Sequence, residues 1–173
     1  MDLKENFFEI FRLQPLFHID KQLLKRRYRE IQKNIHPDRF ADSDAQQKRL
    51  SQQYTSLVNE AYEVLDDDFS RALYLLQLVG VDTTKEVTTA NTDFLMEQMQ
   101  LRERLAAVKE QAEPENELAE LGSVLKVKIN EKARAFLQAF EKSEYDQARK
   151  VTLEWQFLVK LQEDLRRVED ELF

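Results

Sequence analysis

The residues in this sequence that are best suited to chemistry or to specific recognition are His36, Pro37 and Asp38, which follow one another in the chain. Pro37 restricts its own backbone and disfavours a helical conformation in the residue before it. We therefore expect a loop that holds an imidazole and a carboxylate outside the regular helices, as a hydrogen-bond donor and an acceptor in a fixed relation. The alternative interpretation is that the tripeptide only ends a helix, where a nearby histidine is favourable.

An enzyme active site is a poor explanation for this loop, because it would need a nucleophile, a base or a metal held in a pocket. The sequence contains no cysteine and no glycine-rich phosphate loop, and its only other imidazole is His18. Disulfides and thiolate-bound metals are therefore excluded, and no His/Cys cluster can form. We expect no catalytic residue, no cofactor and no metal site.

The helix expected before the tripeptide has an apolar face and a basic strip. The apolar residues recur at spacings of four, three and four, which predicts one buried face of a helix that ends before Pro37. They are Leu24, Tyr28, Ile31 and Ile35. Four cationic residues fall on another side of the same helix. They are Lys25, Arg26, Arg29 and Lys33. On a chain with a net charge of −7, such a strip indicates a docking surface, although it is also compatible with a merely solvated face.

The rest of the first domain is expected to be helical as well. Strands and tight turns use glycine and proline, yet the sequence has only 2 glycines and 3 prolines. Asp20 is placed to cap the basic helix. Ser43 with Gln46 forms a capping pattern that predicts the start of a helix returning along it as an antiparallel hairpin. With a short helix on either side of the hairpin, this domain is predicted to cover residues 1–78.

A second helical domain is predicted after a connector. Residues 79–91 are polar and lose the apolar period, which is typical of a linker. Helices are then expected at about 92–112, 115–142 and 144–171, with Pro114 in the first turn of the second of them. Short connections imply an antiparallel three-helix bundle over residues 92–173, so that the whole chain is predicted to be all-α.

The helix expected over 92–112 has apolar residues on two sides. Its core side is expected to carry Phe94, Leu101, Leu105 and Val108. The outer side carries three further apolar residues and an acid. They are Leu95, Met96, Met99 and Glu103. An apolar outer face indicates a partner site, and methionines suit one because their thioethers adapt to a partner's shape. The alternative is that the N-terminal domain covers this face.

Two parts of the chain resemble known families. The basic helix, the His-Pro-Asp loop and the segment VNEAYEVL at 58–65 resemble the J-domain over residues 1 to about 78, and Ser70-Arg71-Ala72 resembles that family's fourth helix. The segment DFLMEQM at 93–99, with LRE after it, resembles the C-terminal domain of the HscB family of bacterial iron–sulfur cluster assembly. The segment HPDRF at 36–40 resembles the loop of that family.

The resemblance implies a co-chaperone that is not an enzyme. In J-domains the basic helix docks on a DnaK-type ATPase and the His-Pro-Asp loop triggers ATP hydrolysis, so these roles would carry over to the basic strip and to residues 36–38. In the HscB family the chaperone is HscA and the client is the scaffold protein IscU. The scaffold would bind the outer face around Leu95 and Met99, with Phe157 of the last helix beside it. Gln100 stands where related sequences can carry an acid, which argues against a required charge there.

Other functions fit the sequence less well. The negative net charge argues against nucleic-acid binding, and the breaks at Pro37, the connector and Pro114 argue against a sustained coiled coil. No run reaches the roughly 18 apolar residues that a membrane span needs, and the first residues lack the features of a secretory signal or transit peptide. We therefore expect a cytoplasmic protein. The alternatives are a general J-domain adaptor for another client and a non-enzymatic helical interaction protein.

Overall fold

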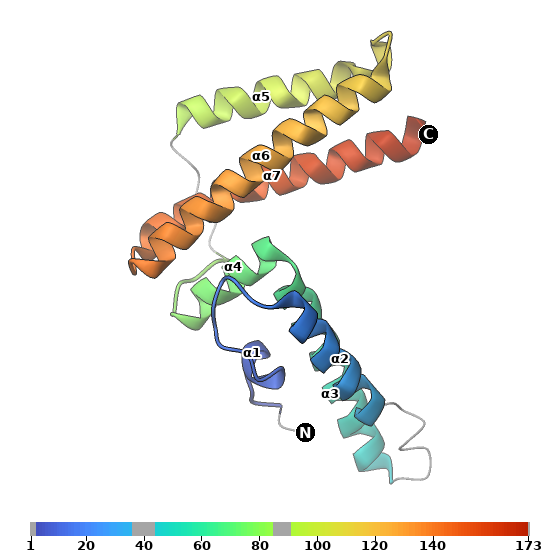
Figure 1. Ribbon diagram of the computed structural model, residues 1–173, viewed down its shortest axis with the longest axis vertical. Helices are drawn as coiled ribbons and strands as arrows, with labels where there is room; N and C mark the ends of the chain where they lie inside the picture. Colours follow the sequence, from blue (N-terminus) through green and yellow to red (C-terminus); the bar gives the residue numbers. More distant parts are fainter. Residues whose placement is uncertain (1–2, 36–43, 85–90, 173) are drawn as a thin grey trace. The chain divides into compact units, whose positions relative to one another are not determined.

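The computed structural model describes residues 3–35, 44–84 and 91–172 (Figure 1). Every regular element in these ranges is helical, as predicted. The elements are α1 (Phe7–Ile10), α2 (Lys21–Ile35), α3 (Ala45–Asp66), α4 (Asp68–Leu78), α5 (Thr92–Ala107), the 3-10 turn η2 (Val108–Glu110), α6 (Pro114–Glu141) and α7 (Tyr145–Leu172). The chain divides into two compact units, Met1–Leu75 and Leu76–Phe173. None of the helices in the described ranges combines the length and hydrophobicity that crossing a bilayer requires.

The first unit is built on a helical hairpin. α2 and α3 lie side by side in opposite directions, and α1 packs against α3 (Figure 1). The core between these helices consists of apolar side chains with no exposed surface. They include Phe8, Phe11, Leu24, Val58, Ala61 and Leu65. Burying a side chain of this size stabilises the fold by roughly 1.5–3 kcal/mol, so this core fixes how α2 lies on α3.

Aspartates begin both arms of the hairpin. The Asp20 carboxylate accepts a hydrogen bond from the Leu23 backbone N–H at 2.9 Å, which confirms the predicted cap of α2. The start predicted for the next helix at Ser43 is wrong by one residue. The cap is Asp44, whose carboxylate accepts from the Gln47 N–H at 2.8 Å. Serine and aspartate are about equally good caps, so two adjacent candidates could not be separated by their type alone.

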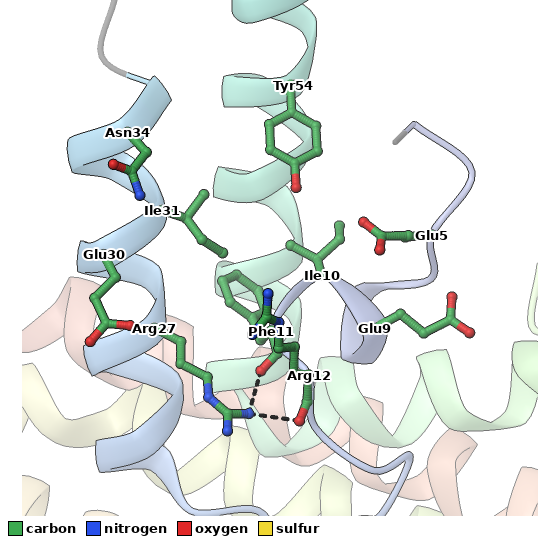
Figure 2. A pocket seen from close by; sticks show the side chains of 10 residues that line it. All are labelled: Glu5, Glu9, Ile10, Phe11, Arg12, Arg27, Glu30, Ile31, Asn34 and Tyr54. Atoms are coloured by element: carbon green, nitrogen blue, oxygen red, sulfur yellow. Dashed lines mark hydrogen bonds between the residues drawn. The ribbon is translucent and has the colours of Figure 1, made fainter. Parts of the chain in front are cut away.

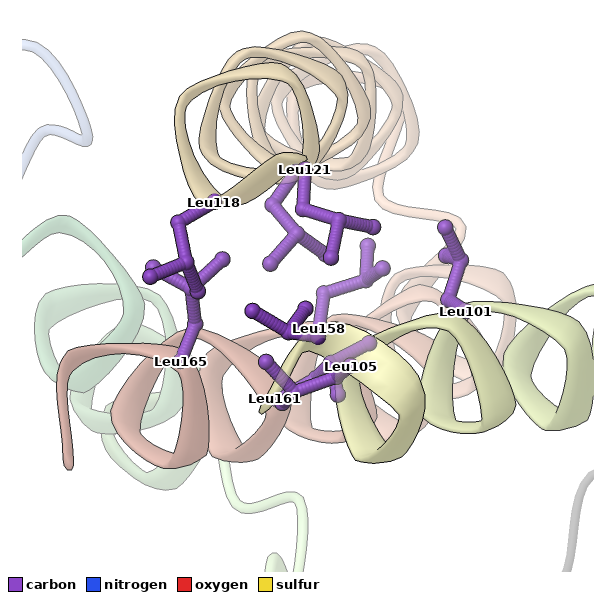
Figure 3. Packing of buried hydrophobic residues seen from close by; sticks show 9 residues of the cluster. Leu101, Leu105, Leu118, Leu121, Leu158, Leu161 and Leu165 are labelled. Carbon is purple, nitrogen blue, oxygen red and sulfur yellow. The ribbon is translucent and has the colours of Figure 1, made fainter. Parts of the chain in front are cut away.

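The second unit contains the predicted antiparallel three-helix bundle of α5, α6 and α7 (Figure 1). Leucines from all three helices point into one cluster (Figure 3). The buried residues of this cluster are Leu101, Leu105, Val108, Leu118, Leu121, Leu125, Leu158, Leu161 and Leu165. Pro114 lies in the first turn of α6 as predicted, where its missing N–H is not needed. α5 ends earlier than predicted, because the chain tightens into η2 before residue 112.

Candidate functional site

The first candidate surface is the basic strip on α2, formed by Lys25, Arg26, Arg29 and Lys33. All four side chains are exposed. Within the ranges that the structure describes, none of them has a salt-bridge partner. Together with Gln22 and Glu30 they line a surface depression of about 410 Å³. Because these positive charges are not neutralised by described neighbours, they are available to an acidic partner.

Arg27 lies next to this strip in the sequence but has a different role. Its guanidinium donates to the backbone carbonyl oxygens of Phe11 and Arg12, each at 2.6 Å, beside a pocket of about 510 Å³ (Figure 2). Arg12 has a φ of 51°, in the left-handed region, so the chain turns sharply after α1. The guanidinium satisfies carbonyls that this turn leaves without helical partners. Arg27 therefore holds α1 against α2 and does not contribute to the strip.

Polar contacts also hold α2 on α3. The Asn59 side-chain oxygen accepts hydrogen bonds from the Tyr28 hydroxyl, at 3.0 Å, and from the Gln32 amide. The Tyr28 ring stacks on Tyr62 with 4.2 Å between the ring centroids. These contacts resist rotation of α2 about its own axis, and they thereby set the direction in which the basic strip faces.

The predicted trigger residues His36, Pro37 and Asp38 lie outside the described residues, so their role stays a prediction. The structure describes α2 up to Ile35, and the stop predicted at Pro37 also lies outside the described residues. The carbonyl oxygen of Ile35 accepts a hydrogen bond from the hydroxyl of Ser51 on α3. Ser51 could not be recognised from the sequence, because a single serine in an amphipathic helix carries no signal of such a contact.

A buried arginine joins three segments of the first unit. Arg71 of α4 is 2% exposed. Its Nε donates to the Phe17 carbonyl at 2.7 Å, one terminal nitrogen donates to the Leu65 carbonyl, and the other pairs with the Asp68 carboxylate at 2.7 Å. The guanidinium also lies over the Phe17 ring, 5.2 Å from its centroid. Arg71 thus ties the segment before α2 and the end of α3 to α4, a role that its place in the sequence did not predict.

The second candidate surface is the outer face of α5. The side chains of Leu95, Met96 and Met99 are 38%, 57% and 62% exposed. Glu103 is exposed on the same side of the helix. Three exposed apolar side chains within two turns form a patch that water solvates poorly and that a partner can cover.

Phe157 of α7 connects this region to the rest of the bundle. It is 36% exposed, and its ring meets that of Phe94 edge-on with 6.1 Å between the centroids. Nearby, Glu154 accepts a hydrogen bond from the Asn91 amide at 3.0 Å and pairs with Lys132. The start of α5 is therefore attached to the bundle largely by polar and aromatic contacts, because the leucine cluster begins further along the helix.

Gln98 is a polar residue buried on the core side of α5. It is 4% exposed, and neither its amide oxygen nor its amide nitrogen has a hydrogen-bond partner in the described part of the chain. A buried polar atom without a partner costs about 1–3 kcal/mol, and replacing it by an apolar group of similar size removes that cost. Urea unfolding followed by the fluorescence of the single tryptophan, Trp155, should therefore show Gln98→Leu to be more stable by about 1–2 kcal/mol.

The matched control for this substitution is Gln100→Leu on the exposed side of the same helix. It adds the same apolar volume and should change the free energy of unfolding by less than about 0.5 kcal/mol. Equal stabilisation by both variants would attribute the gain to helix propensity instead of the buried amide. A loss of stability in Gln98→Leu would mean that the amide is satisfied in solution.

Two family models match the chain, one for each unit. A model described as the DnaJ domain matches residues 6–74, and one described as the HSCB C-terminal oligomerisation domain matches residues 90–166. A co-chaperone HscB homolog from Shewanella halifaxensis is 40% identical over 172 residues, which cover 97% of this chain and 99% of that protein. Another from Shewanella pealeana is 39% identical over 171 residues, with coverage of 96% and 98%.

Solved structures agree with these matches. The chaperone HscB from Vibrio cholerae has a TM-score of 0.86 and 33% identity, covering 98% of this chain and 100% of its own. The human co-chaperone HscB also has a TM-score of 0.86, with 28% identity and coverage of 98% and 84%. Sequence and structure are thus similar over nearly the whole length, across both units. The chain therefore belongs to the HscB family of J-domain co-chaperones.

Proposed function

We propose that this co-chaperone acts on a DnaK-type chaperone of the HscA kind and delivers the iron–sulfur scaffold protein IscU to it in the cytoplasm. The basic strip on α2 docks on the ATPase of the chaperone, and His36, Pro37 and Asp38 trigger ATP hydrolysis. The outer face of α5, with Glu103 and Phe157, binds the scaffold. The co-chaperone positions its partners and makes no covalent bond itself.

The observation that supports this proposal is the presence of two exposed surfaces of opposite character, one on each compact unit. The strip on α2 is cationic, and charges of this kind steer and orient an acidic partner over a distance. The outer face of α5 is apolar and rich in methionine, which suits close packing against an apolar partner. Surfaces that differ this much in chemistry fit two different partners, as an adaptor between a chaperone and its client requires.

The chain has no cysteine, and the described residues contain no group of three or more metal-ligating side chains. This composition is compatible with a role in which a cluster, if present, stays on the scaffold as cargo. The proposal assigns no cluster ligand to the co-chaperone. It requires only that the scaffold surface complementary to α5 be accessible when the scaffold meets the chaperone.

The experiment that tests the proposal is single-turnover ATP hydrolysis by HscA, measured with and without this protein and with purified IscU. We expect the protein to raise the hydrolysis rate and IscU to raise it further. Stimulation that does not depend on the scaffold would favour the alternative of a general J-domain adaptor for another client. Failure to stimulate HscA or any other DnaK-type chaperone would overturn the proposal.

His36→Gln is expected to abolish this stimulation while leaving scaffold affinity unchanged, because the substitution removes the imidazole without touching α5. The same hydrolysis assay measures the first effect and a direct binding titration with IscU measures the second. His18→Gln is the matched control, since it removes the only other imidazole from an exposed position in the same unit. Loss of scaffold binding in folded His36→Gln protein would contradict the division of roles between the two units.

A further inference from the structure

The first two turns of α5 carry the apolar patch of the proposed scaffold site, yet they have little apolar packing of their own. Leu101 is the first residue of α5 in the leucine cluster (Figure 3). Before it, α5 buries only Phe94 and Gln98, and the amide of Gln98 has no hydrogen-bond partner in the described part of the chain. Burying a polar group without a partner is unfavourable. Other contacts must therefore hold this end of α5 on the bundle.

A closed set of four residues joins this end of α5 to both other helices. Lys132 of α6 pairs with one carboxylate oxygen of Glu154 on α7. The other oxygen accepts a hydrogen bond at 3.0 Å from the side chain of Asn91, the N-cap of α5. The Asn91 side-chain oxygen accepts from the Phe94 N–H at 3.2 Å. The Lys132 ammonium completes the set, because it lies over the Phe94 ring, 5.1 Å from its centroid. We call these four residues the clamp.

The ion pair of the clamp is shielded from water. The side chains of Lys132 and Glu154 are 24% and 14% exposed. In a second lysine–glutamate pair of α7, between Lys109 and Glu171, both side chains are 52% exposed. Exposed pairs contribute little because water and salt screen them, whereas a cation over an aromatic ring is held more strongly as it loses water. The clamp is therefore the pair whose loss should be felt by the helix that it holds.

Phe94 connects the clamp to the proposed scaffold site. Its ring contacts the Lys132 ammonium and also meets the Phe157 ring edge-on, with 6.1 Å between the centroids. Leu95 and Met96 follow Phe94 directly in the chain and are exposed. Contacts that fix Phe94 therefore set two things together, namely the turn of α5 that bears the apolar patch and the aromatic side chain beside it.

We propose that Lys132 and Glu154 are positioning residues for the scaffold-binding face of α5. They act from α6 and α7 without contacting the scaffold, by keeping the first two turns of α5 in the conformation that binds. Apparent affinity falls with the fraction of molecules in the competent conformation, so loosening the clamp weakens binding although every contact residue remains. The inference rests on the proposed function, because it concerns how the same face is held.

The test is isothermal titration of purified IscU into variants of the clamp. Lys132→Met keeps an unbranched apolar stem but removes the ammonium, and Glu154→Gln removes the charge of its partner. We expect each substitution to weaken scaffold binding by about three- to tenfold, the factor that one net hydrogen bond corresponds to. Lys132→Arg should keep most of the affinity, because a guanidinium also pairs with a carboxylate and stacks on an aromatic ring.

The double variant separates positioning from direct contact with the scaffold. Residues that share one set of contacts have effects that do not add, so Lys132→Met combined with Glu154→Gln should bind about as well as the weaker single variant. A double variant whose loss equals the product of the two single losses would overturn the inference. Glu171→Gln is the matched control, because it breaks the exposed pair of α7 with Lys109 and should leave scaffold affinity unchanged.

Hydrogen exchange followed by mass spectrometry gives a readout that does not depend on the scaffold. Amides of residues 94–99 should exchange faster in Lys132→Met and in Glu154→Gln, but not in Glu171→Gln, with peptides from the second half of α7 unchanged in all three. Scaffold affinity of both clamp variants equal to that of the unchanged protein would overturn the inference.

Two other outcomes have distinct meanings. A uniform loss of protection throughout the bundle would also overturn the inference, because Lys132 and Glu154 would then only stabilise the fold. Lack of IscU binding by the unchanged protein would instead overturn the proposed function, and the first titration of the series detects it.

Discussion

Replacing Leu95, Met96 and Met99 together with alanine is expected to weaken scaffold binding by about a hundredfold or more. The three side chains are 38%, 57% and 62% exposed, so their removal leaves the bundle core in place. Alanine also has the highest helix propensity, which preserves α5. Each truncation removes apolar area worth roughly 1 kcal/mol or more in an interface, and every ~1.4 kcal/mol changes affinity tenfold. Isothermal titration of the scaffold into the variant measures the effect.

Val127→Ala is the matched control for this variant. Val127 is an apolar residue of α6 with 58% of its surface exposed, and it lies outside the proposed site, so its truncation should leave scaffold affinity unchanged. The triple variant should still stimulate the chaperone normally when no scaffold is present, because α2 is unaltered. Scaffold affinity equal to that of the unchanged protein would remove the outer face of α5 as the binding site.

Structural features that depend on residues within one or two helical turns could be predicted from the sequence. Asp20 and Pro114 mark helix starts because capping and proline geometry act over a single turn. The apolar side chains on the outer face of α5 were recognisable because they do not fit the period of the core side. The end of α5 at Ala107 was missed, because no glycine or proline there signals the change to a 3-10 turn.

Features that depend on contacts between distant residues could not be predicted. Serine, glutamine and arginine are mostly exposed residue types, so residue type argued against the burial of Ser51, Gln98 and Arg71. Ser51 donates to a backbone carbonyl, and so do two of the nitrogens of Arg71. Every residue possesses such a carbonyl, so these contacts leave no trace in a sequence. The carbonyl that Arg71 Nε contacts lies 54 residues away. Only the folded arrangement of the helices reveals such pairs.

Replacing Arg71 with methionine is expected to lower the free energy of unfolding of the first unit by about 2–5 kcal/mol. Methionine keeps an unbranched apolar stem but has no donor, so the carbonyls of Phe17 and Leu65 lose the hydrogen bonds from the guanidinium. Each unsatisfied buried group costs about 1–3 kcal/mol, and the Asp68 carboxylate loses one of its cations. Hydrogen exchange of peptides from α3 and α4 measures the loss, with peptides from α7 as the internal reference.

Two further measurements separate the causes of this loss. Lysine keeps the charge but not the planar fork of donors, so Arg71→Lys should recover only part of the stability. The pKa of Asp68 provides the second check. Its partial burial raises that pKa, but hydrogen bonds from Lys21 and Arg71 more than offset this, so the pKa lies below its ordinary value.

A lowered carboxyl pKa contributes stability above the unfolded pKa, near 3.9, and this contribution is lost as the pH falls through the folded pKa. Arg71→Met removes one of the two cations that lower the pKa of Asp68, while Lys21 remains. The variant should therefore lose less additional stability than the unchanged protein when the pH is reduced from about 5 to about 2. Equal acid sensitivity in the two proteins would mean that the ion pair contributes nothing. The whole effect of Arg71 would then come from the backbone carbonyls that it satisfies.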